Sequence, residues 1–176
     1  NNEHYILNQR MMAVAFEWHN YGKSTIGNRS DIERVPIDKL HDFYRKYYQP
    51  PNAVLTIAGK FDEAKAIEYI VQFFEPIPRP RHRIEATYTE EPAQDGEREV
   101  VLRRVGKVPM VGVMYHTPAA AHADVPALDV LARVLGSAPS GRLYRTLVVG
   151  KKATTVSVEV SALHDPGVLQ IFASVG

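Results

Sequence analysis

Residues 21–60, which read YGKSTIGNRSDIERVPIDKLHDFYRKYYQPPNAVLTIAGK, carry the clearest structural pattern in this chain. Their middle predicts an amphipathic helix whose apolar stripe is formed by Ile37, Leu40, Phe43 or Tyr44, and Tyr47. Pro36 suits the first turn of this helix, and Pro50-Pro51 must end it. The short β-branched run at residues 53–58 then predicts a buried strand. Nothing in the stretch suggests a nucleophile, a set of metal ligands or a phosphate-binding loop.

Further helices are expected on both sides of this stretch. The helix before it has one apolar face, formed by Leu7, Met11, Val14 and Trp18. Gly22 is placed to end that helix. Ser30 and Glu33 have the spacing of a capping box, and Asp62 is a good N-cap for a helix after residue 60.

The segment from Pro76 to Gly96 has four prolines and no helical period, so an extended connector is expected there. Beyond it the sequence alternates between strand and helix signals. The expected elements are strands at 99–105 and 108–117 joined around Gly106, a helix from about Asp124 to a stop at Gly136, a short helix capped by Ser140, and two strands at 154–163 and 168–175 joined by a turn at 164–167. No regular βαβ alternation is present. The pattern favours an α+β fold with helices packed on largely antiparallel sheets.

Composition excludes several classes of function. Hydrophobic residues make up 45% of the chain and charged residues 23%, which is ordinary for a globular protein. The net charge of +1 indicates no general attraction to nucleic acid. The absence of cysteine excludes disulfides, thiol nucleophiles and Cys-ligated metals from these residues and leaves the cellular compartment open. No apolar run approaches the roughly 20 residues that span a bilayer.

The residues that could carry chemistry do not form a recognisable site. The histidines are His4, His19, His41, His82, His116, His122 and His164, and none pairs with another at the spacing of a helical zinc site. Asn1-Asn2-Glu3-His4 would complete an inverted zinc motif, His-x-x-Glu-His, only if a histidine preceded it. The basic run at 79–83 is expected to be solvated linker, and Ser140 a helix cap rather than a nucleophile. We therefore assign no catalytic, cofactor-binding or metal-ligating residue.

Residues 21–62 resemble the later part of a catalytic-type domain in the pitrilysin/insulinase family of zinc peptidases. The resemblance is carried by Tyr21-Gly22, Ile26-Gly27, Asp31-Ile32, Leu40, Phe43-Tyr44, Tyr47-Tyr48, Pro50, Asn52, Ala53-Val54-Leu55, Gly59 and Phe61-Asp62. Trp18-His19-Asn20-Tyr21 stands where many relatives have a His-Pro-Tyr loop. The match is specific because loop, helix, proline stop and strand arrive in the family's order.

A second block resembles the segment that opens the next domain of this family. It comprises residues 127–135, Gly136 and Ser140-Gly141-Arg142-Leu143-Tyr144. The resemblance implies that residues 1–78 are the C-terminal part of one domain, 79–97 a linker, and 98–176 the N-terminal part of a second, homologous domain. It implies two partial α+β lobes, with unpaired strand edges and exposed apolar faces that favour a homodimer.

By the same resemblance, the parent protein is a zinc metalloendopeptidase that hydrolyses peptides in an enclosed chamber. Its zinc ligands are expected upstream of Asn1, so these residues should hold no zinc themselves. The expected partners are a peptide substrate and further family domains or a partner subunit, without nucleic acid and without a membrane span. The resemblance suggests a bacterial periplasmic setting.

One departure from the family pattern leaves an alternative open. Family domains that contribute a transition-state Arg and a Tyr place them after the second block, but residues 147–155 read LVVGKKATT and contain neither. This fits a zinc-bearing half whose partner half supplies the pair. It equally fits an inactive family member that acts as a structural or peptide-guiding subunit.

Overall fold

The computed structural model describes residues 2–80, 83–106 and 108–176, and the described chain forms two compact units. The sheet unit contains residues 2–25 and 89–176, and the helical unit contains residues 26–88. Asn1 of the incomplete zinc motif and residues 81–82 of the basic run lie outside the described residues. The expected division at 78/79 and 97/98 concerns homologous domains rather than contact units, and it stays a prediction.

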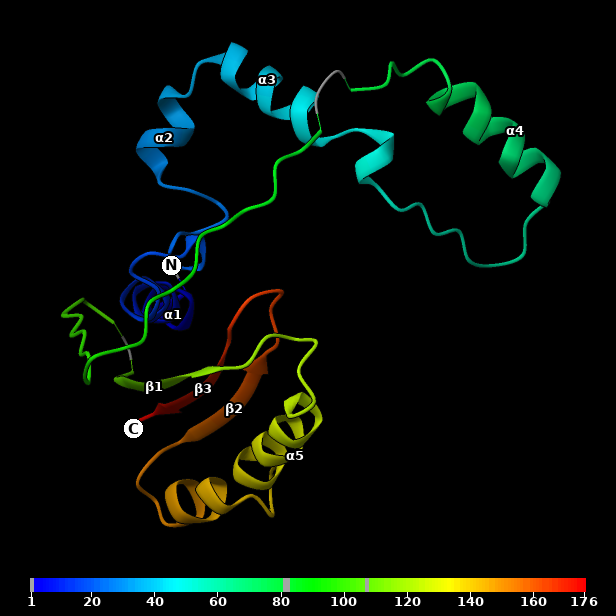
Figure 1. The fold of residues 1–176 in the computed structure, drawn as a ribbon. Coiled ribbons are helices and arrows are strands. Elements are labelled where there is room, and N and C mark those ends of the chain that lie inside the picture. The colour runs from blue at the N-terminus through cyan, green and yellow to red at the C-terminus, as the bar shows by residue number, and fades with distance from the viewer. Residues whose placement is uncertain (1, 81–82, 107) are drawn as a thin grey trace. The chain divides into compact units, whose positions relative to one another are not determined.

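The sheet unit is built on three antiparallel strands in the order β1-β3-β2 (Figure 1). These strands are β1 (Met110–Thr117), β2 (Thr155–Ser161) and β3 (Gly167–Ser174). β2 and β3 form the hairpin expected around residues 164–167, with Glu159 opposite Gln170. β1 pairs with the other side of β3, with Met114 opposite the same Gln170. The predicted α+β class with an antiparallel sheet is confirmed.

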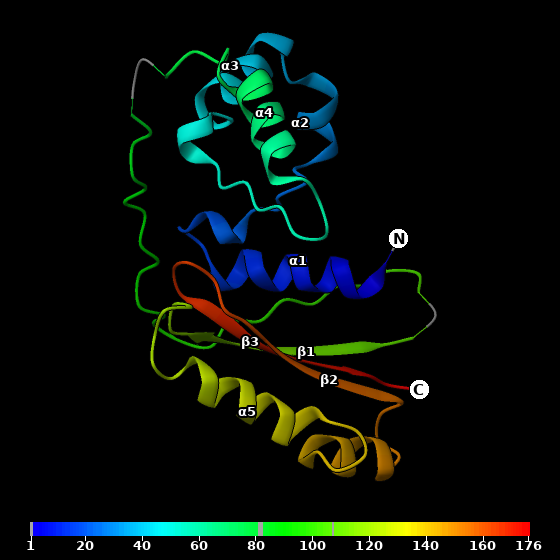
Figure 2. The same cartoon turned by 90° about the vertical axis from the view of Figure 1, so that its right-hand side faces the viewer.

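The core lies on the two faces of the central strand, β3. Helix α1 (Glu3–Ala15) covers one face of the sheet and α5 (Val125–Gly136) covers the other (Figure 2). Val168 is 0% exposed, and Leu169 and Phe172 are buried with it. Burying each of these side chains stabilises the unit by about 1.5–3 kcal/mol. β3 is the best-buried strand because it alone has a partner on both edges.

Gly136 serves close packing between α5 and β2. It is the last residue of α5, near the stop expected from the sequence. A Cβ atom there would lie 2.8 Å from Cγ2 of Val158 and 3.1 Å from its backbone nitrogen. Only glycine lets the helix end approach the strand this closely.

Two helix ends differ from the expectation. α1 ends at Ala15, with Phe16 as its C-cap, rather than continuing to Gly22. Trp18 is outside the helix and 70% exposed, so its predicted place on the apolar face is wrong. The expected short helix after residue 140 is a π-helix, η3 (Tyr144–Val149), and no side chain caps it. Ser140 therefore does not act as the predicted cap.

The helical unit contains α2 (Arg29–Arg34), α3 (Ile37–Tyr47) and α4 (Glu63–Phe74). The predicted cap of α4 is confirmed, because an Asp62 side-chain oxygen accepts a 3.1 Å bond from Lys65 N–H. The predicted capping box of Ser30 and Glu33 is wrong, because α2 begins after Asn28 and Ser30 lies inside its first turn. The one-turn helix η2 (Pro50–Asn52) follows the end of α3 at Tyr47, as the prolines predict.

Two expected strands do not form in the structure. Residues 53–58 and 99–105 pair with no strand among the described residues. Both predictions are wrong for the same reason: a β-branched run becomes a strand only when another edge satisfies its backbone. The two runs are left open to solvent, and Val54 is 94% exposed. Among the described residues no helix is long and apolar enough to cross a membrane.

Candidate functional site

The turn after α1, residues 16–22, is held by a carboxylate from far along the chain. The two oxygens of Glu91 accept three backbone N–H bonds, 3.0, 2.9 and 2.8 Å long, from Glu17, Trp18 and His19. Partial burial acts to raise the pKa of Glu91, but these N–H donors and nearby His116 outweigh it and lower the pKa below its ordinary 4.5. The carboxylate therefore stays ionised and fixes the path of the turn.

His19 links the same turn to the β2–β3 hairpin. Its Nε2 lies 3.2 Å from an Asp165 carboxylate oxygen, and its Nδ1 accepts a 3.2 Å bond from Tyr21 N–H. The Tyr21 hydroxyl in turn accepts a 3.2 Å bond from Asp165 N–H. Because Nδ1 is an acceptor, the neutral ring carries its proton on Nε2 and donates it to Asp165. Each ring nitrogen of His19 therefore has a hydrogen-bond partner although the ring is buried.

Phe16 forms the apolar centre beneath this network. It is 2% exposed, and its ring centroid lies 5.5 Å from that of Tyr21 and 4.7 Å from that of His116, both in edge-on geometry. Gly22 is required for the turn to close, because a Cβ atom there would lie 2.0 Å from the Phe16 carbonyl oxygen. The turn and β1 therefore meet at one buried ring.

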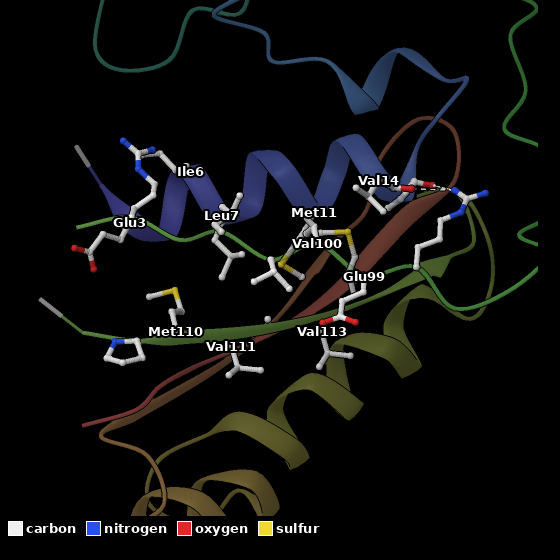
Figure 3. A pocket seen from close by; sticks show the side chains of 18 of the residues that line it. Glu3, Ile6, Leu7, Met11, Val14, Glu99, Val100, Met110, Val111 and Val113 are labelled. Atoms are coloured by element: carbon white, nitrogen blue, oxygen red, sulfur yellow. Dashed lines mark hydrogen bonds between the residues drawn. The ribbon is translucent and has the colours of Figure 1, made fainter. Parts of the chain in front are cut away.

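A trough of about 1420 Å³ runs beside β1, between α1 and residues 97–106 (Figure 3). Apolar side chains of α1 line one wall, among them Leu7, Met11 and Val14. Every residue from Val108 to His116 contributes to the lining, so the trough follows nearly the whole of β1. Its volume exceeds the roughly 300–1,000 Å³ of small-molecule pockets. The shape is that of a channel for an extended chain rather than a pocket for a compact ligand.

Charged side chains line the trough beside the apolar ones. Arg98, at the end nearest the turn, is already used: it pairs with Glu17 at 3.3 Å and donates a 2.9 Å bond to the Val14 carbonyl. Two acidic and two basic side chains of the wall have no ion-pair or hydrogen-bond partner among the described residues, namely Glu97, Glu99, Arg103 and Arg104. The trough wall therefore carries unpaired side chains of both charges.

The histidines are dispersed. His4 packs on Phe172 with ring centroids 4.2 Å apart, and His164 Nδ1 lies 3.2 Å from the Asp165 carboxylate that also meets His19. His122 lies beside Asp124, while His41 is on α3 and His82 lies outside the described residues. Within residues 2–80, 83–106 and 108–176 no three His, Cys, Asp or Glu side chains are grouped to hold a metal ion.

Sequence reasoning did not find the roles of Glu91, His19 and Asp165. The available signal was positional: His19 stands where relatives have the His-Pro-Tyr loop. Glu91 lies in a connector without a pattern, and the sequence around Asp165 indicates only a turn. The bond from His19 N–H to Glu91 joins residues 72 apart in sequence and the contact between His19 and Asp165 joins residues 146 apart, separations that local patterns do not report.

The comparisons with known proteins agree with this geometry. Residues 34–176 match the inactive domain of peptidase M16. The chain is 33% identical over 145 residues to the zinc protease PqqE of Helicobacter pylori, covering 81% of this chain and 33% of that protein. The crystal structure of a protease from Helicobacter pylori superposes with a TM-score of 0.90 at 30% identity, over 100% of this chain and 43% of that one.

A more distant structure shows the same fold. The ferredoxin protease FusC, solved as a mutant in complex with Arabidopsis ferredoxin, gives a TM-score of 0.61 at 19% identity, over 99% of this chain and 20% of that one. The chain belongs to the pitrilysin/insulinase-type peptidase M16 family, and most of it corresponds to the family's inactive domain. It spans about a third of the length of the curated relative described above.

Proposed function

We propose that these residues are the non-catalytic portion of a zinc metalloendopeptidase and form part of the wall of its peptide chamber. The single observation that carries the proposal is the match of residues 34–176 to the inactive domain of a peptidase family. The trough beside β1 supports it, because it offers a long surface that is partly apolar and carries charged side chains, of the kind an extended peptide occupies.

The family's zinc does not fit the donor groups of this chain. Its inverted motif requires two histidines and a glutamate on one helix, and the sequence contains no such set. The nearest cluster in the described residues is His19, Asp165 and His164, in which both rings meet the carboxylate of Asp165. That carboxylate is thereby occupied as a hydrogen-bond acceptor. We therefore propose that the zinc ligands of the parent protein lie upstream of Asn1. We assign these residues no chemical role in peptide hydrolysis.

The second candidate is an inactive family member that serves as a structural or peptide-guiding subunit. Residues 147–155 favour it to the extent that they lack the Arg and Tyr of the family pattern. In the enzyme hypothesis, a partner half supplies that pair. The residues encoded before Asn1 separate the two: an intact His-x-x-Glu-His supports the enzyme, and a degenerate one supports the scaffold.

The expected partners follow from the same proposal. Other domains of the family, or a partner subunit, would complete the chamber and cover apolar surface left open here. A homodimer is the corresponding expectation for these residues alone. The bacterial periplasm is the proposed compartment, on the strength of the family resemblance alone. Cell fractionation with an antibody against the chain tests the compartment directly.

The decisive experiment compares the whole protein with a variant in which the upstream glutamate of the inverted motif is replaced by glutamine. The whole protein should cleave a quenched fluorescent peptide in a zinc-dependent manner, and the variant should lose that cleavage while keeping its fold. A whole protein that binds peptide but never cleaves it, with or without added zinc, would establish the scaffold instead.

A further inference from the structure

All the methionines of this chain belong to one helix and one strand. Met11 and Met12 lie in α1, and Met110 and Met114 lie in β1. The chain has no cysteine, so these four thioethers hold its only sulfur atoms. Oxidation converts a methionine from a flexible apolar side chain into a polar sulfoxide. What that change does to the fold depends on where the four side chains lie.

The two methionines of β1 face α1. A Cβ atom on Gly112 would lie 2.8 Å from Cε of Met11, so α1 covers the even-numbered face of β1. Side chains two positions apart in a strand share a face, which places Met110 and Met114 on either side of that contact. Figure 3 shows Met110 directed towards α1 and Val111 directed to the opposite side. Met11 and the two β1 methionines therefore occupy one layer between the helix and the sheet.

This layer is closed to solvent at Met11 and accessible at the two β1 methionines. Met11 is 8% exposed, whereas Met110 and Met114 are half-buried and line the trough. A small neutral oxidant in the trough therefore reaches the sulfur atoms of β1 before that of Met11. The facing wall is formed by apolar side chains of α1, among them Leu7 and Val14. A sulfoxide oxygen on β1 would thus be placed against aliphatic groups.

Met12 differs because it has a polar neighbour. Nε2 of Gln170 is directed at the sulfur of Met12 across 3.8 Å, and Gln170 is 6% exposed. A thioether is a weak acceptor, and a sulfoxide oxygen would be a stronger one for this amide. Oxidation of Met12 should therefore disturb the packing of α1 little, which makes Met12 an internal control.

We propose that Met110 and Met114 are oxidation sites through which a hydroperoxide loosens α1 from the sheet. The thioether sulfur attacks the hydroxyl oxygen of the hydroperoxide, and a sulfur–oxygen bond forms as the oxygen–oxygen bond breaks. The hydroxyl proton passes to the departing oxygen, which leaves as an alcohol or, from hydrogen peroxide, as water. The sulfur loses two electrons and the hydroperoxide gains them. The polar sulfoxide is poorly accommodated against aliphatic side chains, so α1 has to move away from β1 to hydrate it.

The test exposes the full-length protein to hydrogen peroxide, removes the peroxide with catalase, and measures oxidation and amide exchange by peptide-resolved mass spectrometry. Met110 and Met114 should each gain one oxygen before Met11 does. Amides of residues 3–15 should then exchange about tenfold faster, because the packing of α1 is weakened. Amides of α5, on the other face of the sheet, should change by less than about twofold. Methionine sulfoxide reductases for both epimers, with dithiothreitol as reductant, should restore the original rates.

Substitutions separate the two β1 sites from general oxidative damage. The double variant Met110→Leu, Met114→Leu nearly conserves volume and should remove the response of α1 to peroxide, whereas the matched control Met12→Leu should keep it. Met114→Gln introduces a polar group without an oxidant and should speed exchange in α1 about tenfold, while Met12→Gln should change it by less than about twofold. Circular dichroism verifies folding, and the glutamine pair tests the proposal even if the double leucine variant does not fold.

Three results would overturn the proposal. The first is complete oxidation of Met110 and Met114 with unchanged exchange in α1. The second is faster exchange in α1 without oxygen on either residue, and the third is a folded double leucine variant that responds to peroxide as the parent does. None of these measurements depends on peptide cleavage, so the outcome is separate from that of the peptidase test.

Discussion

Glu91 holds the turn after α1 through three backbone hydrogen bonds. One carboxylate accepts the backbone N–H groups of three consecutive turn residues, Glu17, Trp18 and His19, which follow the end of α1. His19 and Asp165 then join the same turn to the β2–β3 hairpin. Glu91 of the connector and Asp165 of the hairpin thus fix a turn that lies far from both of them in the sequence.

Replacing Glu91 by Gln should lower the free energy of unfolding of the sheet unit by about 1–3 kcal/mol near pH 7, because an uncharged amide has one acceptor oxygen instead of two. Denaturant titration followed by circular dichroism measures the change. Glu90→Gln is the matched control, since Glu90 is exposed and should change the value by less than about 0.5 kcal/mol.

The same variant should change the pH dependence of stability. The folded-state pKa of Glu91 is lowered, so its stabilisation is fully present above its ordinary value of 4.5 and is lost as pH falls through the folded-state pKa. The difference between parent and Glu91→Gln should therefore be constant near neutrality and shrink below pH 4.5. A difference that grows on acidification would contradict this assignment.

His19→Ala should destabilise the sheet unit by about 2–4 kcal/mol, because it removes a buried ring and leaves the Asp165 carboxylate and the Tyr21 N–H without that partner. His164→Ala is the control: its side chain meets the same carboxylate but is 93% exposed. Thermal unfolding of the two variants should differ clearly. Equal effects would show that contact with Asp165, rather than burial, carries the stabilisation.

At the level of elements, helices and strands differ in how much they depend on neighbours. α3 and α4 form although their apolar faces, including Leu40 and Phe74, are exposed, because a helix satisfies its own backbone. A strand cannot do this. Of the β-branched runs, those at β1, β2 and β3 find partners, and those at 53–58 and 99–105 find none in the described chain.

The contact between α5 and β2 offers a direct test of close packing. Gly136→Ala should cost about 1–3 kcal/mol, since the added methyl group would lie within 3.0 Å of Val158 Cβ and Cγ2. Val158→Ala in the same chain should recover part of this loss. Gly96→Ala, where a Cβ meets nothing within 4 Å, is the control and should be neutral within about 0.5 kcal/mol. Denaturant midpoints of the parent, Gly136→Ala, Val158→Ala and the double variant form a double-mutant cycle.

For the whole molecule, the proposal separates the scaffold from the chemistry. Purified chain 1–176 should contain far less than one equivalent of zinc after dialysis and should not cleave peptides, whereas the full-length protein should hold one zinc per intact motif. Elemental analysis by mass spectrometry measures the zinc content of the short chain and of the full-length protein. Stoichiometric zinc on the short chain, retained against a weak chelator, would contradict the assignment of the ligands to upstream residues.

Much of the fold is readable from local patterns. The β2–β3 hairpin follows from two β-rich runs around His164-Asp165-Pro166-Gly167, and α5 from its apolar spacing and the glycine at its end. The Asp62 cap follows from one residue type at a helix start. These features depend on residues a few positions apart, and so a short stretch of sequence is enough to predict them. The family follows similarly, because its blocks are continuous in sequence.

Other features arise only from contacts between distant segments. β1 joins β3 across about fifty residues, Glu91 reaches back to the turn after α1, and the trough exists because α1 and residues 97–106 lie on either side of an open strand edge. Amino-acid type predicts that a run is able to form a strand or that a carboxylate is able to accept N–H bonds. Which edge or which N–H it meets depends on how the whole chain packs, and so the sheet order and the trough required the three-dimensional structure.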